Sequence, residues 1–289
     1  MDKTELFDIK ISDVSETLLL TLYAHALESQ SKNPILNDPK AVEIMQKMNK
    51  ELSRSKNKLH KRLVKGKLGR KLVVHVSIRA KKYDDYVRNF LKHSPDGVVV
   101  NIGCGLDTRF SRIDNGQVNF YDLDLPEVIE IKRKFLEESD RYHFIPSSVF
   151  NYEWMTPLLQ DVKGPFMFIA EGVFMYLEKA YVKSLVLKLQ SQFPGSELVC
   201  EVVNDLWLSK PLKRLVNFKL QKELHLGKDA TYNFGIRDNK EMEGWNPGIK
   251  LLDDWSYFDS QEKKLGWLRL FRHIKLFRTI QWTVHYKLN

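Results

Sequence analysis

Short apolar runs that alternate with amphipathic stretches limit this chain to few folds. The runs cover residues 98–102, 118–123, 142–145, 166–170 and 198–203. The stretches that follow them have apolar residues at helical spacing, as in EVIEIKRKFLEES and KAYVKSLVLKLQSQF. Strands that alternate with helices favour a parallel sheet with helices on both faces. The sequence therefore predicts an α/β domain.

The C-terminal end has a different period. In TIQWTVHYKL, residues 279–288, every second residue from Ile280 is apolar, which indicates a strand with one face in water. It fits an antiparallel strand that joins the sheet late, beside GIKLLDDW. Residues 204–247 are polar and aromatic without a clear strand–helix unit, and we interpret them as a lid insertion.

A glycine-rich turn follows the first apolar run. Gly103 and Gly105 lack side chains, so backbone N–H groups there can approach a ligand, and the N-terminus of the next helix favours negative charge. The second run leads into FYDLDLP, which places Asp122 and Asp124 about 20 residues further on, where an acid accepts hydrogen bonds from ribose hydroxyls. Together these features predict a nucleotide-like cofactor.

Two cofactors fit this turn differently. A dinucleotide fingerprint requires a third glycine, where this chain has Thr108, and the preceding Asp107 would lie beside the pyrophosphate. S-adenosylmethionine carries no phosphate and needs no third glycine. The turn therefore favours S-adenosylmethionine, and an NAD(P)-dependent Rossmann oxidoreductase is the alternative.

Three segments of the chain read NIGCGLDTRF, YDLDLPEVIEIKRKFL and AEGVFMYL. They resemble motifs of the leucine carboxyl methyltransferase family, which includes the bacterial tetracenomycin-type polyketide O-methyltransferases. The resemblance extends over most of the chain up to about residue 205. It implies a Rossmann-like class I methyltransferase fold, with seven strands that are mostly parallel and an antiparallel last strand, and S-adenosylmethionine as methyl donor.

The resemblance and the sequence periods divide a single methyltransferase domain, residues 1–289, into four parts. We expect a helical N-terminal cap, a cofactor-binding core, the lid insertion, and C-terminal strands with a helix that complete the sheet; these cover residues 1–93, 94–203, 204–247 and 248–289.

The resemblance also assigns cofactor contacts. It places Arg79 on the methionine carboxylate of the cofactor, in keeping with the bidentate binding of carboxylates by guanidinium groups. It places Gly103 and Gly105 along the methionine portion, and Asp124 on the ribose, with Asp122 as the alternative. A solvated helix arginine is the other interpretation of Arg79.

Four further positions follow from the same resemblance. Glu171 matches the acid near the amino end of the cofactor, and it can also cap the next helix. Ser148 and Val149 stand where the family usually has Asp-Leu to receive the adenine amine, so the adenine contact is weakened. His25 stands where the family commonly has an arginine; we interpret it as a half-buried structural residue, with a contact to substrate or cofactor as the alternative.

The methyl acceptor is less defined. A carboxylate needs no proton removed, whereas a phenol needs a general base, for which His25 and Glu171 are poor candidates and Tyr176 is only a positioning group. We therefore favour a carboxylate or acidic hydroxyl, on a small molecule or a protein C-terminus. Asp107 and Arg109 fit a structural ion pair as well as a functional role, with Arg109 as a candidate substrate contact.

Charge is concentrated in residues 47–71, which hold eleven of the 46 Lys and Arg residues and one of the 37 acids. Such runs are usually solvated faces. A nucleic-acid-binding methyltransferase is the alternative, but this segment has no Phe, Tyr or Trp to stack bases.

Residues 263–278 predict a helix with a basic stripe beside an apolar stripe. We expect Leu268, Phe271 and Phe277 to pack on the sheet, with peripheral membrane contact as the alternative. Cys104 and Cys200 are the chain's two cysteines, too few for a disulfide framework or a four-cysteine zinc site, and we expect no metal. We also expect no signal peptide and no membrane span, which favours the cytoplasm.

Overall fold

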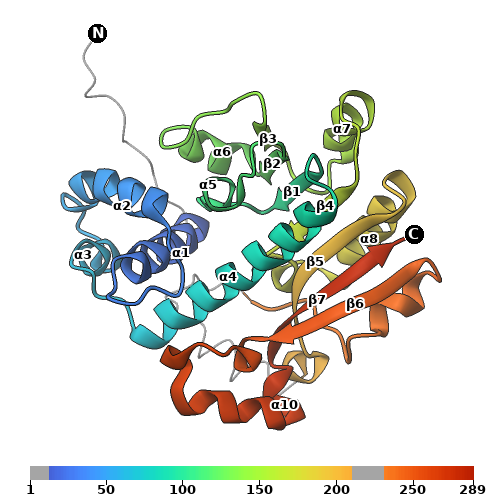
Figure 1. The fold of residues 1–289 in the computed structure, drawn as a ribbon. Helices are drawn as coiled ribbons and strands as arrows, with labels where there is room; N and C mark the ends of the chain where they lie inside the picture. The colour runs from blue at the N-terminus through green and yellow to red at the C-terminus, as the bar shows by residue number, and fades with distance from the viewer. Residues whose placement is uncertain (1–12, 210–230) are drawn as a thin grey trace.

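The sheet has seven strands in the order β3-β2-β1-β4-β5-β7-β6 in the computed structural model, which describes residues 13–209 and 231–289 (Figure 1). The strands are β1 (Val98–Ile102), β2 (Asn119–Asp124), β3 (Tyr142–Pro146), β4 (Phe166–Ala170), β5 (Ser196–Val203), β6 (Ile249–Ser256) and β7 (Gln281–Leu288). Strands β1 to β5 pair in parallel, whereas β7 lies antiparallel between β5 and β6. The predicted sheet, with its late antiparallel strand beside residues 249–256, is confirmed.

The polar side of β7 is buried in its middle, so the expectation of a wet face is wrong there and holds only at the partly exposed ends, Gln281 and Lys287. Thr283 and His285, which alternate with its apolar residues, are 1% and 8% exposed. The imidazole of His285 lies 5.2 Å from the ring of Tyr86 and 2.8 Å from a carboxylate oxygen of Glu197. A helix therefore covers this face, and polar partners replace the water that the sequence pattern suggests.

Helices cover both faces of the sheet. The α-helices of the described residues are α1 (Asp13–Ser29), α2 (Pro39–Leu52), α3 (Lys58–Val64), α4 (Arg70–His93), α5 (Arg109–Ile113), α6 (Pro126–Lys132), α7 (Met155–Asp161), α8 (Lys179–Gln192) and α10 (Lys275–Arg278). Val99 of β1 packs in one buried cluster with Phe90 of α4, and Val98 and Val100 pack in a second cluster with Leu185 of α8. Because both sides of β1 are buried, its sequence is a continuous apolar run.

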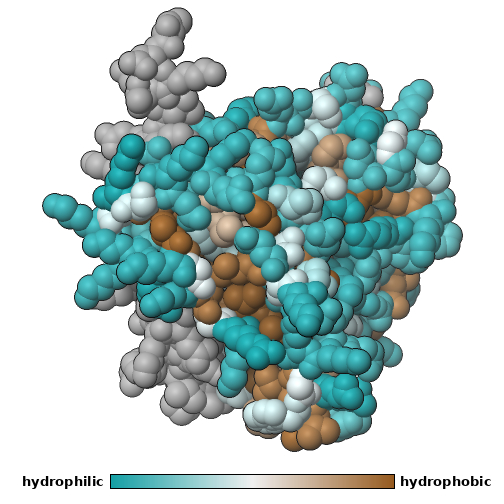
Figure 2. All heavy atoms as spheres, turned by 60° about the vertical axis from the view of Figure 1, so that its left-hand side comes forward, coloured by the Kyte–Doolittle hydropathy of each residue, from teal (hydrophilic) through white to brown (hydrophobic). Residues whose placement is uncertain are grey.

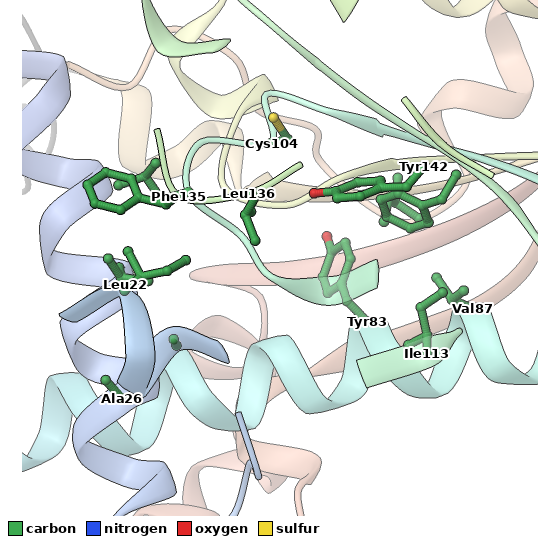
Figure 3. Packing of buried hydrophobic residues seen from close by; sticks show 14 of the residues in the cluster. Leu22, Ala26, Tyr83, Val87, Cys104, Ile113, Phe135, Leu136 and Tyr142 are labelled. Carbon is green, nitrogen blue, oxygen red and sulfur yellow. The ribbon is translucent and has the colours of Figure 1, made fainter. Parts of the chain in front are cut away.

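The N-terminal helices share the core of the sheet. Figure 3 shows Leu22 and Ala26 of α1 and Tyr83 of α4 gathered with Cys104 and Tyr142, which follow β1 and begin β3. Figure 1 shows α1 to α3 grouped beside the N-terminal part of α4. Residues 13–93 are therefore attached to the sheet through a common apolar interior.

The basic segment 47–71 forms the end of α2, all of α3 and the start of α4. All eleven of its Lys and Arg residues are exposed, whereas Leu52, Leu59 and Leu63 are buried in the core. Figure 2, which brings this side of the molecule forward, shows a mostly hydrophilic surface. The segment is thus a solvated face of a packed helical layer.

Residues 263–278 do not form the predicted continuous helix. They form a run of 3-10 turns, η6 (Lys263–His273), followed by the four-residue α10. The cause is local: Gly266 has a φ of 59°, which breaks helical geometry. Leu268, Phe271 and Phe277 are partly buried, and Trp267 is 67% exposed, so the expected packing on the sheet is wrong in its main part.

The segment predicted as a lid is described only at its ends, since residues 210–230 lie outside the described residues. The described part includes η3 (Asp205–Leu208) and η4 (Glu241–Trp245). Phe234 and Ile236 are fully buried against the core. In the described residues, no helix has the length and apolar character needed to cross a membrane.

Candidate active site

The glycine turn after β1 has a backbone that only glycine adopts readily. Gly103 and Gly105 have φ values of 65° and 51°. A Cβ atom on Gly103 would lie 2.4 Å from the nearest side-chain carbon of Val173, and one on Gly105 would lie 2.6 Å from that of Leu18. The turn is therefore enclosed by α1 on one side and by the loop after β4 on the other, with no room for side chains of its own.

Asp124 ends β2 directly beside this turn. Its carboxylate accepts hydrogen bonds from the backbone N–H groups of Gly105 and Leu125, both at 2.8 Å. Burial raises the pKa of Asp124 above its ordinary value, although these two N–H groups act in the opposite direction. The carboxylate is partly exposed, so it can still accept hydrogen bonds from a ligand.

Asp122 lies two residues before Asp124 in β2, and its side chain is fully enclosed. It accepts hydrogen bonds from Asn101 at 2.8 Å and from the hydroxyl of Tyr142 at 2.6 Å, and it forms an ion pair with Lys132 at 2.7 Å. The side chains of Asp122 and Lys132 are 1% and 0% exposed. The carboxylate is thus committed to groups within the fold, which leaves Asp124 as the better ribose candidate.

Arg79 of α4 joins the ends of two neighbouring strands. Its Nε lies 2.8 Å from Glu171, just after β4, and its Nη1 lies 3.0 Å from Glu201 of β5. Burial raises the pKa of Glu171, but Arg79 and Arg109 outweigh it, so the pKa is below its ordinary value. Burial raises the pKa of Glu201 above its ordinary value despite Arg79. Arg79 is therefore not a solvated helix arginine.

A second arginine extends this cluster inward. The Nε of Arg109 lies 2.8 Å from Asp84, its Nη1 lies 2.8 Å from Asp107, and its Nη2 contacts Glu171. Its side chain is 0% exposed. Arg109 therefore forms structural ion pairs, and these fix the positions of Asp107 and Glu171 from the buried side of the network.

Three members of the network were not anticipated from the sequence. Arg112 pairs with Asp84 at 2.7 Å and with Asp38 at 2.6 Å, and Asp38 also caps α2 by accepting from the N–H of Ala41. The signals were present, because Asp38 precedes a proline at a helix start and Arg112 lies one helical turn after Arg109. No motif, however, links these positions to one another.

The network contains more acids than guanidinium groups. Around Arg79, Arg109 and Arg112 are five carboxylates, those of Asp38, Asp84, Asp107, Glu171 and Glu201. S-adenosylmethionine carries a sulfonium and an ammonium group. A surplus of negative charge together with a guanidinium group is therefore a suitable environment for its methionine end.

His25 is 2% exposed, so the expectation of a half-buried residue is wrong. Its Nδ1 lies 3.5 Å from Asp38, and its Nε2 is buried without a hydrogen-bond partner among the described residues. The structure therefore places His25 inside the site, at the side of the acidic network.

The remaining predicted residues lie at the edges of the site. Ser148 follows β3 and accepts a hydrogen bond from the N–H of Phe150 at 3.3 Å, while Val149 packs against the core. Tyr176 packs 5.5 Å from Tyr232 between ring centres, and burial raises its pKa to about 12. No cluster of potential metal ligands occurs in residues 13–209 and 231–289.

Comparisons with known proteins identify the family of this chain. Residues 19–190 match the family model for leucine carboxyl methyltransferase. The tetracenomycin polyketide synthesis O-methyltransferase TcmP of Streptomyces glaucescens is 29% identical over 253 residues, which cover 87% of this chain and 86% of that protein. The S-adenosyl-L-methionine-dependent methyltransferase dpfgK of Gibberella zeae is 24% identical, with 95% of this chain and 92% of that protein covered.

A solved structure supports the fold. The crystal structure of a DUF574 family protein from Streptomyces avermitilis superposes with a TM-score of 0.53 at 11% identity, over 93% of this chain and 97% of that one. The order of the sheet, with β7 between β5 and β6, is that of class I methyltransferases. This chain thus belongs to the leucine carboxyl methyltransferase family and is an S-adenosylmethionine-dependent methyltransferase.

Proposed function

We propose that this enzyme transfers the methyl group of S-adenosylmethionine to a carboxylate oxygen of a small molecule. The names of its relatives support an oxygen acceptor, since TcmP is an O-methyltransferase of polyketide synthesis and the family is named for a carboxyl methyltransferase. The carboxylate acceptor follows from the site's own titratable groups.

None of three such groups at the site is suited to act as a base near neutral pH. His75 lies on α4, four residues before Arg79, and burial together with the charge of Arg79 lowers its pKa to about 3. The pKa of Glu171 is below its ordinary value, and burial raises that of Tyr176 to about 12. An efficient general base has a pKa near the working pH. The pKa values of these three groups support the proposal, because a carboxylate acceptor is already ionised and needs no base.

The cofactor contacts follow from the same geometry. We propose that Arg79 binds the methionine carboxylate and that Glu171 accepts hydrogen bonds from the ammonium group. The backbone of Gly103 and Gly105 would line the methionine portion, and Asp124 would accept from the ribose hydroxyls. Ser148 and Val149 would lie beside the adenine.

Bound S-adenosylmethionine supplies a methyl group on a positively charged sulfur. The residues of the chain hold this group in line with the acceptor oxygen, and such alignment accounts for much of the rate enhancement in bimolecular reactions. The acidic network around Glu171 favours the positive charge, and the apolar side chains of Leu18 and Val173 flank the turn and limit access of water.

The experiment is a methylation assay with matched acceptors. The enzyme is incubated with labelled S-adenosylmethionine and either 2-naphthoic, salicylic or octanoic acid, or with 2-naphthol and catechol. We expect methyl esters from at least one acid, with a kcat/KM that stays level between about pH 6 and 9, because the carboxylate is ionised throughout. Methylation of the hydroxyl compounds alone, with a rate that rises with pH, would contradict the proposal.

A further inference from the structure

His75 occupies a position that the cofactor contacts do not explain. It lies on α4, four residues before Arg79, and therefore one turn away on the same face of the helix. Its ring packs against Tyr257, with 4.5 Å between ring centres. Within the part of the chain that the structure describes, neither ring nitrogen has a hydrogen-bond partner.

The direction of α4 places this imidazole beyond the ends of the strands. Tyr83 contacts the carbonyl of Ala170, the last residue of β4, and Arg79, one turn earlier, contacts Glu171. Each turn of an α-helix advances 5.4 Å. His75 is one further turn out, on the side where open α/β sheets bind their ligands, past the carboxyl ends of the strands.

The surroundings of His75 lower the pKa of its ring and so favour the neutral imidazole. Burial is the main cause, and the charge of Arg79 adds to it, whereas Glu171 acts in the opposite direction. A neutral imidazole has one N–H donor and one acceptor nitrogen. His75 is half-buried, so its ring nitrogens can be reached from outside, and its N–H can donate a hydrogen bond to a ligand that offers an acceptor.

We propose that His75 donates a hydrogen bond to one oxygen of the acceptor carboxylate and thereby directs the other oxygen toward the methyl group. This inference rests on the proposed carboxylate O-methylation. In the transfer the bond between sulfur and methyl breaks and a bond between oxygen and methyl forms, and the sulfur keeps the electron pair. No proton is transferred, and His75 remains neutral before and after the reaction.

The test compares His75→Phe with His75→Gln in the full chain. Phe keeps a planar ring without a donor, whereas Gln keeps an N–H donor. With the acid that the wild type methylates best, we expect His75→Phe to raise KM about tenfold or more and His75→Gln to recover most of the loss. Affinity for S-adenosylhomocysteine, measured by calorimetry, should stay within about twofold of wild type in both. His93→Phe, at an exposed position of the same helix, is the control.

The outcomes separate this inference from the proposed function. An unchanged KM in His75→Phe overturns the role of His75 even if acids are methylated. Methylation of hydroxyl compounds alone overturns the carboxylate function. In that case the KM for the methylated phenol is compared between His75→Phe and wild type, and an unchanged KM overturns the role of His75 as well. Should His75→Phe fail to fold, nitrogen NMR of wild-type His75 decides: its ring signals should move when the acid is added to the S-adenosylhomocysteine complex, and unmoved signals contradict the contact.

Discussion

Two groups of buried carboxylates in this enzyme use the same residue types for different purposes. Asp122 is enclosed with Lys132, Asn101 and Tyr142, and both charged side chains are at most 1% exposed. Glu171 and Arg79 retain 10% and 14% exposure at the ends of the strands. The first group satisfies its charge within the fold, and the second keeps part of its surface available to a ligand.

Charge balance distinguishes the groups further. Asp122 faces one buried lysine, and burial of that lysine is outweighed by Asp122, so the pKa of Lys132 is above its ordinary value. The network around Glu171 has two more carboxylates than guanidinium groups. A surplus of like charge destabilises a fold unless a ligand of opposite charge binds, so the open network is the one expected to change on cofactor binding.

The largest effect is expected in the enclosed group. Lys132→Met removes the cation and leaves the carboxylate of Asp122 buried without a counter-charge, which should lower the free energy of unfolding by about 3–5 kcal/mol. Urea denaturation measures this, and the double variant Lys132→Met with Asp122→Leu should recover part of the loss. A loss below about 1 kcal/mol would mean that water reaches this pair.

The next prediction compares the replacement of each of the two aspartates of β2 by asparagine. Asp124→Asn should weaken S-adenosylhomocysteine binding by about 1.5–3 kcal/mol, because a charged acceptor is lost from the proposed ribose contact. Asp122→Asn should instead lower stability and leave the affinity of the folded protein near that of wild type. Calorimetry and denaturation on both variants test this division. Equal loss of affinity in the two would show that the enclosed group also shapes the ligand site.

The inner end of the open network should behave like the enclosed group when the pH falls. Burial raises the pKa of Asp38, but His25, Arg112 and Thr108 outweigh it and hold the pKa at about 2, against an ordinary value of 3.8. A lowered pKa stabilises the fold above the unfolded value and loses that effect as pH falls from about 4 to about 2. The stabilisation lost over this pH range amounts to about 2 kcal/mol.

Asp38→Asn keeps the oxygen that caps α2 and removes the charge. We expect it to be less stable than wild type at pH 7 and to lose less stability than wild type between about pH 4 and 2. Urea denaturation at each pH provides the measurement. Parallel curves for the two proteins would mean that Asp38 does not titrate at a lowered pKa.

The sequence was most informative where one local rule decides the structure. The turn at Gly103 and Gly105 follows from a strand that ends in glycines, and the helices and strands of residues 98–203 follow from apolar periods. The strand period alone does not separate Asp122 from Asp124, because residues two apart in a strand point to the same face. Only a distant partner, Lys132 on the next helix, decides between them.

Longer-range packing also explains the wrong predictions. The pattern of residues 263–278 suits a helix, but Gly266 takes a positive φ and the segment follows the surface as 3-10 turns. The alternating polar residues of β7 predict an exposed face, but in the fold α4 covers them. His75 was missed because its four-residue spacing from Arg79 has meaning only once α4 is placed against the strand ends.

The smallest predicted effect tests the charge surplus directly. Burial raises the pKa of Glu201, and the nearby Glu171 adds to this, so its ionised form is disfavoured in the fold. A raised carboxyl pKa makes the fold less stable as pH rises above the unfolded value of 4.5. Glu201→Gln should therefore raise the free energy of unfolding at pH 7, with a difference that shrinks toward pH 4.

Glu197 at the other end of β5 is the matched control for this experiment. It also experiences burial, but His285 and Lys287 outweigh it and lower its pKa, so Glu197→Gln should destabilise the protein at pH 7. Urea denaturation of the two variants at pH 7 and pH 4 compares their signs. If Glu201→Gln were destabilising at pH 7 like Glu197→Gln, the carboxylates around Arg79 would be balanced, and the distinction between an enclosed group and an open, acid-rich group would fail.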